Sequence, residues 1–375
     1  MRPLIIIDYS HTSMRMVFTA IANTKPKKKD GKFITADFIQ YYKHLMFNSL
    51  QFVKNKFKGD VVLAIDSQNN WRKTFYPDYK ANRTKTKEDS DINFDEFFEE
   101  VDKLTDVIRE AFPFKVVKVE GSEADDIAGT ISLKYGNQRP IILVTSDHDW
   151  SQVLSHGNTQ MWDPIKKEYC SLTDFEHTII ETGYGPMSRF TLIHALIGDK
   201  GDNVPSITGM TEFSEPFKSF LKQNEIYTES VKEFNSMEIK DELIEKYDVY
   251  KIVKSGHKKG QTTDEKDIFR TVPFGIKKAE KAAHSKETLD DLLNSHELYR
   301  DNFNRNRILV DFSKVPEELQ EEIIKEFNSV EINYNPDKML EYFMNEKLGQ
   351  HVTGINKFYD VTHETQRTTS LDDFF

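Results

Sequence analysis

Short apolar runs recur along the first half of this chain, and acidic residues follow each of them. Runs of strand length alternate with stretches whose apolar positions have helical spacing, which is typical of a sheet with crossover helices. We predict strands within 4–7, 61–65, 114–119 and 141–146, and helices within 38–57, 94–112 and 190–197. Over residues 1–205 this alternation predicts an α/β fold with a mostly parallel central sheet flanked by helices.

The pattern changes beyond about residue 205. Residues 206–312 are predicted to form a helical C-terminal domain, interrupted by an inserted helical segment at about 210–268. Residues 313–352 are predicted as C-terminal helices, and 353–375 as a flexible polar tail. In the first domain, the polar connection at about 67–95 is long for a link between a strand and a helix. Loops of that length are usually functional or disordered.

Composition narrows the class of protein. A chain of 375 residues suffices for about two domains and a buried core. Its apolar runs are far shorter than the roughly 20 residues that span a bilayer. The single cysteine, Cys170, excludes an internal disulfide and a metal site built from thiolates. We therefore expect a globular protein without membrane contact, located in the cytoplasm, or in the host cytoplasm if a phage encodes it.

The net charge of −11 by itself argues against a nucleic-acid partner, but the distribution of charge does not. Basic residues gather in stretches, at 25–32, 72–87, 251–259 and 270–281. Basic stretches that bind phosphates beside an acidic metal site are the pattern that a nuclease requires, whatever the total charge.

Acidic residues stand where the predicted strands end. The carboxyl ends of parallel strands meet at one edge of an open α/β sheet, so these side chains should converge there. Each one alone is explained more simply as a helix N-cap, but several carboxylates in one crevice repel each other unless cations lie between them. An all-oxygen cluster prefers a hard ion such as Mg²⁺ or Mn²⁺. The candidates are Asp8, Asp66, Glu123, Asp125, Asp126, Asp147, Asp149, Asp199 and Asp202.

Five motifs in this order resemble the successive acidic motifs of the 5′-nuclease or flap endonuclease superfamily, and most of all its ribonuclease H branch in T-even-type bacteriophages. The motifs are Ile7-Asp8-Tyr9-Ser10, Ala64-Ile65-Asp66, Glu123-Ala124-Asp125-Asp126, Ser146-Asp147-His148-Asp149 and Gly198 to Pro205. The resemblance implies a PIN-like nuclease domain followed by a helix–turn–helix DNA clamp. It also implies a monomeric 5′-3′ exonuclease and flap endonuclease that removes RNA primers and 5′ flaps during DNA replication. Its partners would be DNA and RNA–DNA duplexes with 5′ ends or flaps, and a single-stranded-DNA-binding protein.

The resemblance also implies roles for individual residues. Two Mg²⁺ ions, for which Mn²⁺ would substitute, would be bound by two groups of acids: Asp8, Asp66, Glu123, Asp125, Asp126 and Asp147 around the first, and Asp149, Asp202 and Asp199 around the second. The segment from Trp71 to Arg83 resembles the family's arch, under which a single strand passes. Lys80 and Arg83, three residues apart and thus on one helical face, would neutralise the scissile phosphate.

Further residues are expected to contact nucleic acid. Arg72, Lys73 and Lys85 would meet phosphates, and Tyr76 and Tyr79 would stack on bases. Gly198 to Ile207 together with Pro273 to Ala279 resembles the helix–turn–helix clamp, split by the insertion. There Gly275, Lys277 and Lys278 would bind a duplex phosphate.

The chain ends in an apolar turn. Leu371, Phe374 and Phe375 have i, i+3, i+4 spacing and resemble the sliding-clamp-binding peptide of replication enzymes, although Thr368 stands where a glutamine is usual. The alternative is a tail folded back onto the nuclease body.

Two rival functions remain open at this point. One is a phosphatase that uses Asp8 as a covalent nucleophile, although Ser10 stands where such enzymes have a second acid. The other is a non-catalytic, clamp-tethered protein that binds DNA structures.

Overall fold

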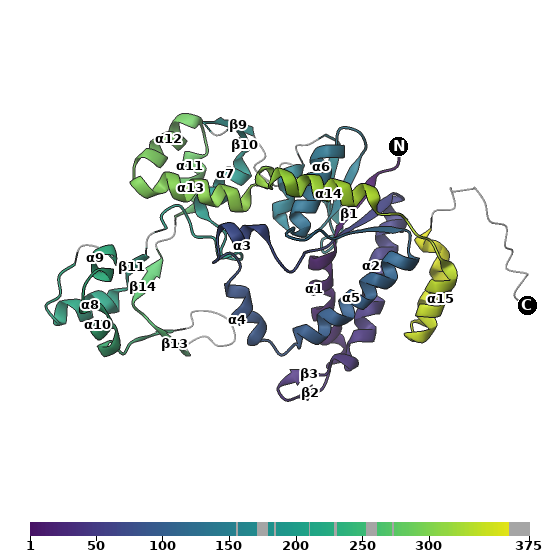
Figure 1. Cartoon of the computed structure of the whole chain (residues 1–375), viewed down its shortest axis with the longest axis horizontal. Coiled ribbons are helices and arrows are strands. Elements are labelled where there is room, and N and C mark those ends of the chain that lie inside the picture. Colours follow the sequence, from purple (N-terminus) through teal and green to yellow (C-terminus); the bar gives the residue numbers. More distant parts are fainter. Residues whose placement is uncertain are drawn as a thin grey trace, which may run out of the picture. The chain divides into compact units, whose positions relative to one another are not determined.

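The computed structural model describes residues 1–154, 157–170, 179–183, 185–209, 211–228, 231–252, 261–271 and 274–359 (Figure 1). The chain divides into two compact units. The first comprises Met1–Thr178, Gly201–Asn203 and Asp311–Phe375, and the second comprises Ile179–Lys200 and Val204–Val310. Within the described ranges, no helix combines the length and the apolar character needed to cross a membrane.

The first unit is built on a six-stranded sheet with the order β5-β4-β1-β6-β7-β8. The first five strands in this order run parallel and β8 is antiparallel to β7, which confirms the predicted fold class. The four predicted strands are neighbours in the sheet, whereas β7 and β8 were not predicted. The strands are β1 (Leu4–Asp8), β4 (Asp60–Ala64), β5 (Phe114–Val117), β6 (Ile141–Val144), β7 (Thr159–Asp163) and β8 (Glu168–Tyr169).

The register of the sheet decides where the acids can meet. Ile7 pairs with Leu63 on one side and Val144 on the other, and Asp8 pairs with Ala64. The residues that follow β1, β4 and β6 therefore leave the sheet at one edge, as the apolar runs predicted. Because the interior of these strands is buried on both faces, they are continuous apolar runs rather than alternating ones.

Helices cover both faces of this sheet. A large core unites one face with α1 (Tyr9–Thr24), α2 (Ile39–Phe57), α5 (Phe94–Ala111), α15 (Pro336–Asn345) and η5 (Gly349–Phe358). On the other face, α6 (Ala124–Tyr135) contacts β1, β4 and β6 and also packs against η2 (His148–Val153), η4 (Phe312–Lys314) and α14 (Glu317–Ser329). The predicted helices within 38–57 and 94–112 are confirmed as α2 and α5.

Two short segments of the first unit lie outside these layers. The predicted arch segment contains α3 (Trp71–Phe75) and α4 (Asn82–Glu88). Between α1 and α2, the chain forms a hairpin of β2 (Lys28–Lys29) and β3 (Lys32–Phe33), followed by η1 (Thr35–Asp37).

The second unit has two cores. One joins α7 (Arg189–Ile197) to α11 (Ile276–Ala282), α12 (Lys286–Asn294) and α13 (Glu297–Val310), next to the strand pair β9 (Ile179–Thr182) and β10 (Gly185–Ser188). Leu192 and Leu196 of α7 share this core with Ala279 and Phe303. The division of the chain therefore falls near residue 178, before α7, rather than at the predicted boundary of 205.

The insertion forms the other core of this unit, around Phe217, Phe234 and Tyr247. Three helices supply most of it: α8 (Glu215–Gln223), α9 (Val231–Asn235) and α10 (Lys240–Lys246). The insertion was predicted as helical, and besides its helices it contains short strands: β11 (Thr211–Phe213) pairs with β14 (Phe269–Thr271), and β12 (Tyr250–Ile252) pairs with β13 (Thr262–Lys266). Antiparallel β11 and β14 bring the two ends of the insertion together, so a segment of this size interrupts the surrounding helices with little cost.

Candidate active site

Asp8 is the last residue of β1 and caps α1. It is 4% exposed. One carboxylate oxygen accepts a hydrogen bond from the His11 amide (2.9 Å), and the other accepts one from the Thr145 hydroxyl at the end of β6 (3.2 Å). The carboxylate is thus tied to two adjacent strands of the sheet.

Asp66 follows β4 and connects three elements. Its amide donates to the Ser10 hydroxyl (2.9 Å), which joins the end of β4 to the start of α1. Its carboxylate accepts a hydrogen bond from the Ala124 amide (2.7 Å), in the first turn of α6. The side chain keeps an exposed surface at the edge of the sheet.

The third acidic group lies at the start of α6. Glu123 is the N-cap, and Asp126 closes a reciprocal capping box with it. Asp125 accepts a hydrogen bond from the Trp150 indole (2.7 Å). The helix begins at Ala124, among these three acids, so all of them belong to its first turn or its cap.

The fourth group follows β6. Asp147 caps η2 by accepting a hydrogen bond from the Asp149 amide (3.0 Å), and its own amide donates to the Thr145 hydroxyl (3.0 Å). Thr145 therefore holds both Asp8 and Asp147, which fixes the ends of β1 and β6 together.

These carboxylates lie close enough together that each raises the pKa of its neighbours by electrostatic repulsion. Burial raises the pKa of Asp8 to about 8, and repulsion from Asp66 and Asp147 adds to the shift. Burial also raises the pKa of Asp125, with Asp147 as its main repelling neighbour, and the pKa values of Asp66 and Asp147 are raised for the same reasons. The edge of the sheet thus carries negative charge that the protein itself does not fully neutralise.

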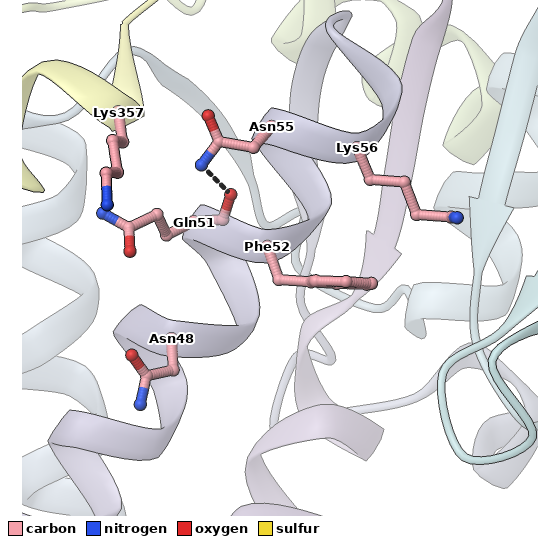
Figure 2. A pocket seen from close by; sticks show the side chains of 6 residues that line it. All are labelled: Asn48, Gln51, Phe52, Asn55, Lys56 and Lys357. Atoms are coloured by element: carbon pink, nitrogen blue, oxygen red, sulfur yellow. Dashed lines mark hydrogen bonds between the residues drawn. The ribbon is translucent and has the colours of Figure 1, made fainter.

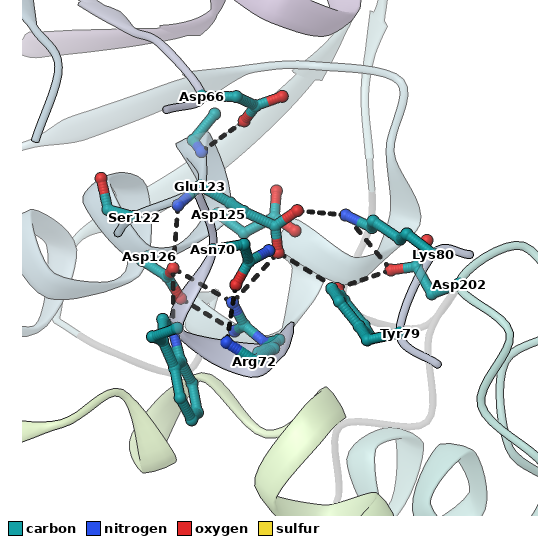
Figure 3. Close-up of polar contacts among 12 residues, drawn as sticks. Asp66, Asn70, Arg72, Tyr79, Lys80, Ser122, Glu123, Asp125, Asp126 and Asp202 are labelled. Carbon is teal, nitrogen blue, oxygen red and sulfur yellow. Dashed lines mark hydrogen bonds and ion pairs between the residues drawn. The ribbon is translucent and has the colours of Figure 1, made fainter. Parts of the chain in front are cut away.

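The arch segment brings cations to this edge (Figure 3). The Lys80 ammonium pairs with Glu123 and lies 3.4 Å from Asp202, and Arg83 pairs with Asp202. The Tyr79 hydroxyl lies within hydrogen-bond distance of Glu123 (3.1 Å) and Asp202 (2.8 Å). Burial alone would raise the pKa of Glu123, but Lys80 and Arg72 outweigh it and hold the pKa at about 2.

The geometry corrects two details of the predicted arch. Lys80 and Arg83 do not share a helical face, because Lys80 has a left-handed backbone (φ 58°) and precedes α4. They converge through their common partner, Asp202, instead. Tyr79 is 3% exposed and engaged with carboxylates, so in this state it offers no ring face to a base. Tyr76 is half-buried, and Lys73 is exposed.

Arg72 was predicted to contact nucleic acid, but it is 1% exposed. Its guanidinium makes two bonds to Asp126 (2.8 and 3.0 Å) and one to Glu123 (3.1 Å). Asp126 is 0% exposed and also accepts from the Trp71 indole (3.2 Å). Arg72 is therefore unavailable to a phosphate. The family resemblance implied that Asp126 helps to hold the first ion. In the structure Asp126 is the buried partner of Arg72, and this ion pair fixes α3 to α6.

The other predicted residues belong to separate places. Asp199, in the second unit, pairs with Val204 through both backbone bonds. Lys277 and Lys278 are exposed in the first turn of α11, and Gly275 is its N-cap. The Lys85 side chain is not among the described atoms, and Leu371, Phe374 and Phe375 lie beyond residue 359, outside the described residues.

Several contacts in this site were not predicted from the sequence. Trp71 and Trp150 each donate an indole N–H to an acid of α6, and Ser10 and Thr145 bind neighbouring strand ends. The position of Trp150, directly after Asp147-His148-Asp149, is the one signal that could have indicated such a role.

A groove of about 460 Å³ on α2, lined by Asn48, Gln51, Phe52, Asn55, Lys56 and Lys357, includes none of the predicted site residues (Figure 2).

The donors at the sheet edge fit a hydrated hard cation. All are carboxylates, and in four of them, Asp8, Asp66, Asp125 and Asp147, burial and mutual repulsion raise the pKa, so a cation would relieve their repulsion. Among the described residues, no three Asp, Glu, His or Cys side chains are grouped to hold an ion directly. Many of the carboxylate oxygens already accept hydrogen bonds from protein N–H and O–H groups. Mg²⁺ commonly keeps several water ligands. Contact through water therefore suits this donor set.

Known proteins match both ends of this chain. Residues 3–183 match the family described as "5'-3' exonuclease, N-terminal resolvase-like domain", and residues 265–358 match "T4 RNase H, C terminal". The ribonuclease H of Enterobacteria phage T4 is 25% identical over 360 residues, which cover 94% of this chain and 95% of that protein. Flap endonuclease Xni of Shewanella sp. (strain ANA-3) is 29% identical over 146 residues, which cover 38% of this chain and 49% of that protein.

A solved structure titled "Crystal Structure of T5 D15 Protein Co-crystallized with Metal Ions" covers 88% of this chain and 99% of its own, with a TM-score of 0.48 and 16% identity. The two family matches lie in the expected order and between them leave out most of the insertion. The chain therefore combines a 5′-3′ exonuclease N-terminal domain with a T4 RNase H C-terminal domain and is a nuclease, as the acidic motifs predicted.

Proposed function

We propose that this protein is a Mg²⁺-dependent, structure-specific 5′-3′ exonuclease and flap endonuclease that removes RNA primers and 5′ flaps during DNA replication. The observation that carries the proposal is the meeting of carboxylates from four strand ends with Lys80 and Arg83 at one edge of the sheet. A nuclease needs both: anionic ligands for cations, and fixed positive charge for the phosphate.

Asp8, Asp66, Asp125 and Asp147, with Glu123, would hold one ion, partly through water. Asp149, Asp202 and Asp199 would hold a second, and Mn²⁺ would substitute for Mg²⁺ at both. Bound in this way, two ions would activate the attacking water and stabilise the leaving oxygen. Glu123 would be available to an ion at any working pH, because Lys80 and Arg72 hold its pKa at about 2 and keep it charged.

Lys80 and Arg83 would change partners when substrate binds. In the free protein they neutralise Glu123 and Asp202. A phosphate bound beside these carboxylates would compete with them for the Lys80 and Arg83 side chains. The carboxylates would then be free to hold a metal ion. The Tyr79 hydroxyl, within reach of both acids, would hold the carboxylates in place during this exchange.

The substrate is a nucleic acid with a 5′ end. Lys73 and Lys85 of the arch segment would bind the cleaved strand, and Gly275, Lys277 and Lys278 would bind the duplex backbone. Contacts of this kind read phosphates rather than bases, so binding should weaken steeply with salt and show little sequence preference. The sliding clamp, bound through Leu371, Phe374 and Phe375, and a single-stranded-DNA-binding protein remain predicted partners of a cytoplasmic monomer.

The phosphatase alternative finds little support in the site. Asp8 accepts two protein hydrogen bonds and is almost fully buried, whereas a covalent nucleophile must reach its substrate. The non-catalytic alternative predicts tight flap binding without cleavage.

The experiment is cleavage of 5′-labelled substrates of four kinds: an RNA-primed duplex, a DNA-flap duplex, a blunt duplex and a single strand. With Mg²⁺, short 5′ products are expected from the first two, and EDTA should abolish them. Binding of the flap without cleavage under either Mg²⁺ or Mn²⁺ would instead establish the non-catalytic protein. A trapped aspartyl-phosphate on Asp8 would establish the phosphatase.

A further inference from the structure

A lysine-rich hairpin between α1 and α2 is not used by the proposed chemistry. β2 and β3 pair Lys28 with Phe33 and Lys29 with Lys32. The two-residue turn between them, Asp30-Gly31, has positive φ at both positions (51° and 79°), which is the geometry of a tight type I′ turn. The lysines are thus displayed on a defined hairpin rather than on a loose loop.

The hairpin is anchored to the far end of the arch segment. Lys28 pairs with Asp91 at 2.5 Å, and the Phe33 amide donates to the Asp91 carbonyl at 2.7 Å. The Lys32 ammonium donates to the carbonyls of Glu88 (3.0 Å) and Ser90. Two of the lysines therefore hold the hairpin against the residues that follow α4.

The other three lysines of this segment do not anchor the hairpin. Lys25, Lys27 and Lys29 are exposed, and within the described ranges their ammonium groups have no ion-pair or hydrogen-bond partner. The hairpin carries one acid, Asp30, and the carboxylate of Asp37 accepts a hydrogen bond from the Lys27 amide (3.0 Å). Free cations on an ordered backbone are suited to bind phosphates, since binding must order only the lysine side chains and not the backbone that carries them.

Helix α4 links this hairpin to the candidate active site. Arg83, in its first turn, pairs with Asp202, and the carbonyl of Glu88, its last residue, accepts from Lys32. Seven helical residues extend about 10 Å. An extended single strand, whose phosphates lie farther apart than the 3.4 Å per strand of a duplex, would place about two phosphates along that distance. A strand that occupies the active site and follows α4 therefore arrives at the hairpin.

We propose that Lys25, Lys27 and Lys29 form a phosphate-binding site for the single strand that continues from the cleaved phosphodiester, so that the hairpin selects substrates with an unpaired 5′ segment. This proposal rests on the nuclease function above. It adds a binding site formed by residues outside the acidic cluster and outside the arch segment.

The test compares wild type with Lys25→Ala/Lys27→Ala/Lys29→Ala and with a matched control, Lys134→Ala/Lys166→Ala/Lys325→Ala, which removes three exposed lysines elsewhere on the first unit. Equilibrium binding is measured in EDTA, so that cleavage does not interfere. The two probes are a duplex with a long single-stranded DNA 5′ flap and the same duplex with a flush 5′ end, each titrated across a range of salt.

The hairpin variant should bind the flapped duplex about tenfold more weakly, and its slope of log affinity against log salt should fall by about 2 for three lost phosphate contacts. Its affinity for the flush duplex, and both affinities of the control variant, should match wild type. An unchanged flap affinity would overturn the proposal, and so would an equal loss on the flush duplex, which would assign the hairpin to duplex backbone. Because the readout is binding, these outcomes are independent of whether the wild-type protein cleaves.

Discussion

The buried ion pair between Arg72 and Asp126 makes a quantitative prediction about stability. In Arg72→Met, the apolar volume is largely kept, but Asp126 loses two guanidinium bonds and Glu123 loses one. Two donors to Asp126 remain, the Glu123 amide and the Trp71 indole. Removal of one partner from a buried pair costs about 3–5 kcal/mol, because the other charge stays buried without compensation.

Unfolding in urea, followed by tryptophan fluorescence, would measure this cost. All three tryptophans of the chain, Trp71, Trp150 and Trp162, belong to the first unit, so the signal reports on the unit that contains the pair. With a denaturant slope of about 3 kcal/mol per molar, the midpoint should fall by about 1–1.7 M.

Arg109→Met is the matched control, since Arg109 forms an exposed pair with Asp106 in which both side chains are at least 43% exposed. Such surface pairs contribute about 0–1 kcal/mol, so the midpoint of this variant should barely move. The double variant Arg72→Met/Asp126→Leu should recover much of the lost stability, because no buried charge is left alone. If Arg72→Met is no less stable than Arg109→Met, the reasoning about the buried pair is wrong.

Three further predictions concern the acids, the arch and the tail. Burial and mutual repulsion raise the pKa of Asp8 to about 8 and also raise those of Asp66, Asp125 and Asp147, so the folded protein binds more protons than the unfolded chain between about pH 4 and 8. In metal-free buffer the free energy of unfolding should therefore fall as pH rises through this window, and Mg²⁺ should restore it at pH 8; a rise in metal-free stability from pH 5 to 8 would contradict this. Lys80→Ala should slow single-turnover cleavage by about 10²–10³-fold, and a rate within twofold of wild type would show that the lysine does not serve the phosphate. Deletion of residues 371–375 should abolish binding to the sliding clamp in a pull-down and leave clamp-free cleavage intact, whereas clamp binding by the shortened chain would refute the predicted role of the tail.

The location of the candidate site could be predicted from the sequence because it depends on two local signals. Apolar runs identify parallel strands, and residues that follow such strands must share an edge. Asp8, Asp66 and Asp147 were located in this way. The start of α6 at Ala124 also agrees with its acidic first turn.

The partners of the site residues could not be predicted, because they come from distant parts of the chain. Arg72 and Asp126 are 54 positions apart, and Tyr79 and Asp202 are 123 apart. A basic residue in a polar segment is usually exposed, and no local pattern indicated that Arg72 would be buried. Similarly, β11 and β12 are three residues each and partly polar, too short for a period of two to stand out from the helices around them.

The central claim is that the carboxylates at the sheet edge form the metal site of a nuclease. Its most direct test is the single-turnover rate of flap cleavage against Mg²⁺ concentration for wild type, Asp147→Asn and Asp60→Asn. Asp60 begins β4, at the opposite end of the strand from Asp66, where it pairs with Arg139. We predict that Asp147→Asn loses most of the activity at all Mg²⁺ concentrations or requires far more Mg²⁺ to regain it, while Asp60→Asn follows the wild-type curve. Equal rates and equal Mg²⁺ dependence in all three proteins would contradict the claim.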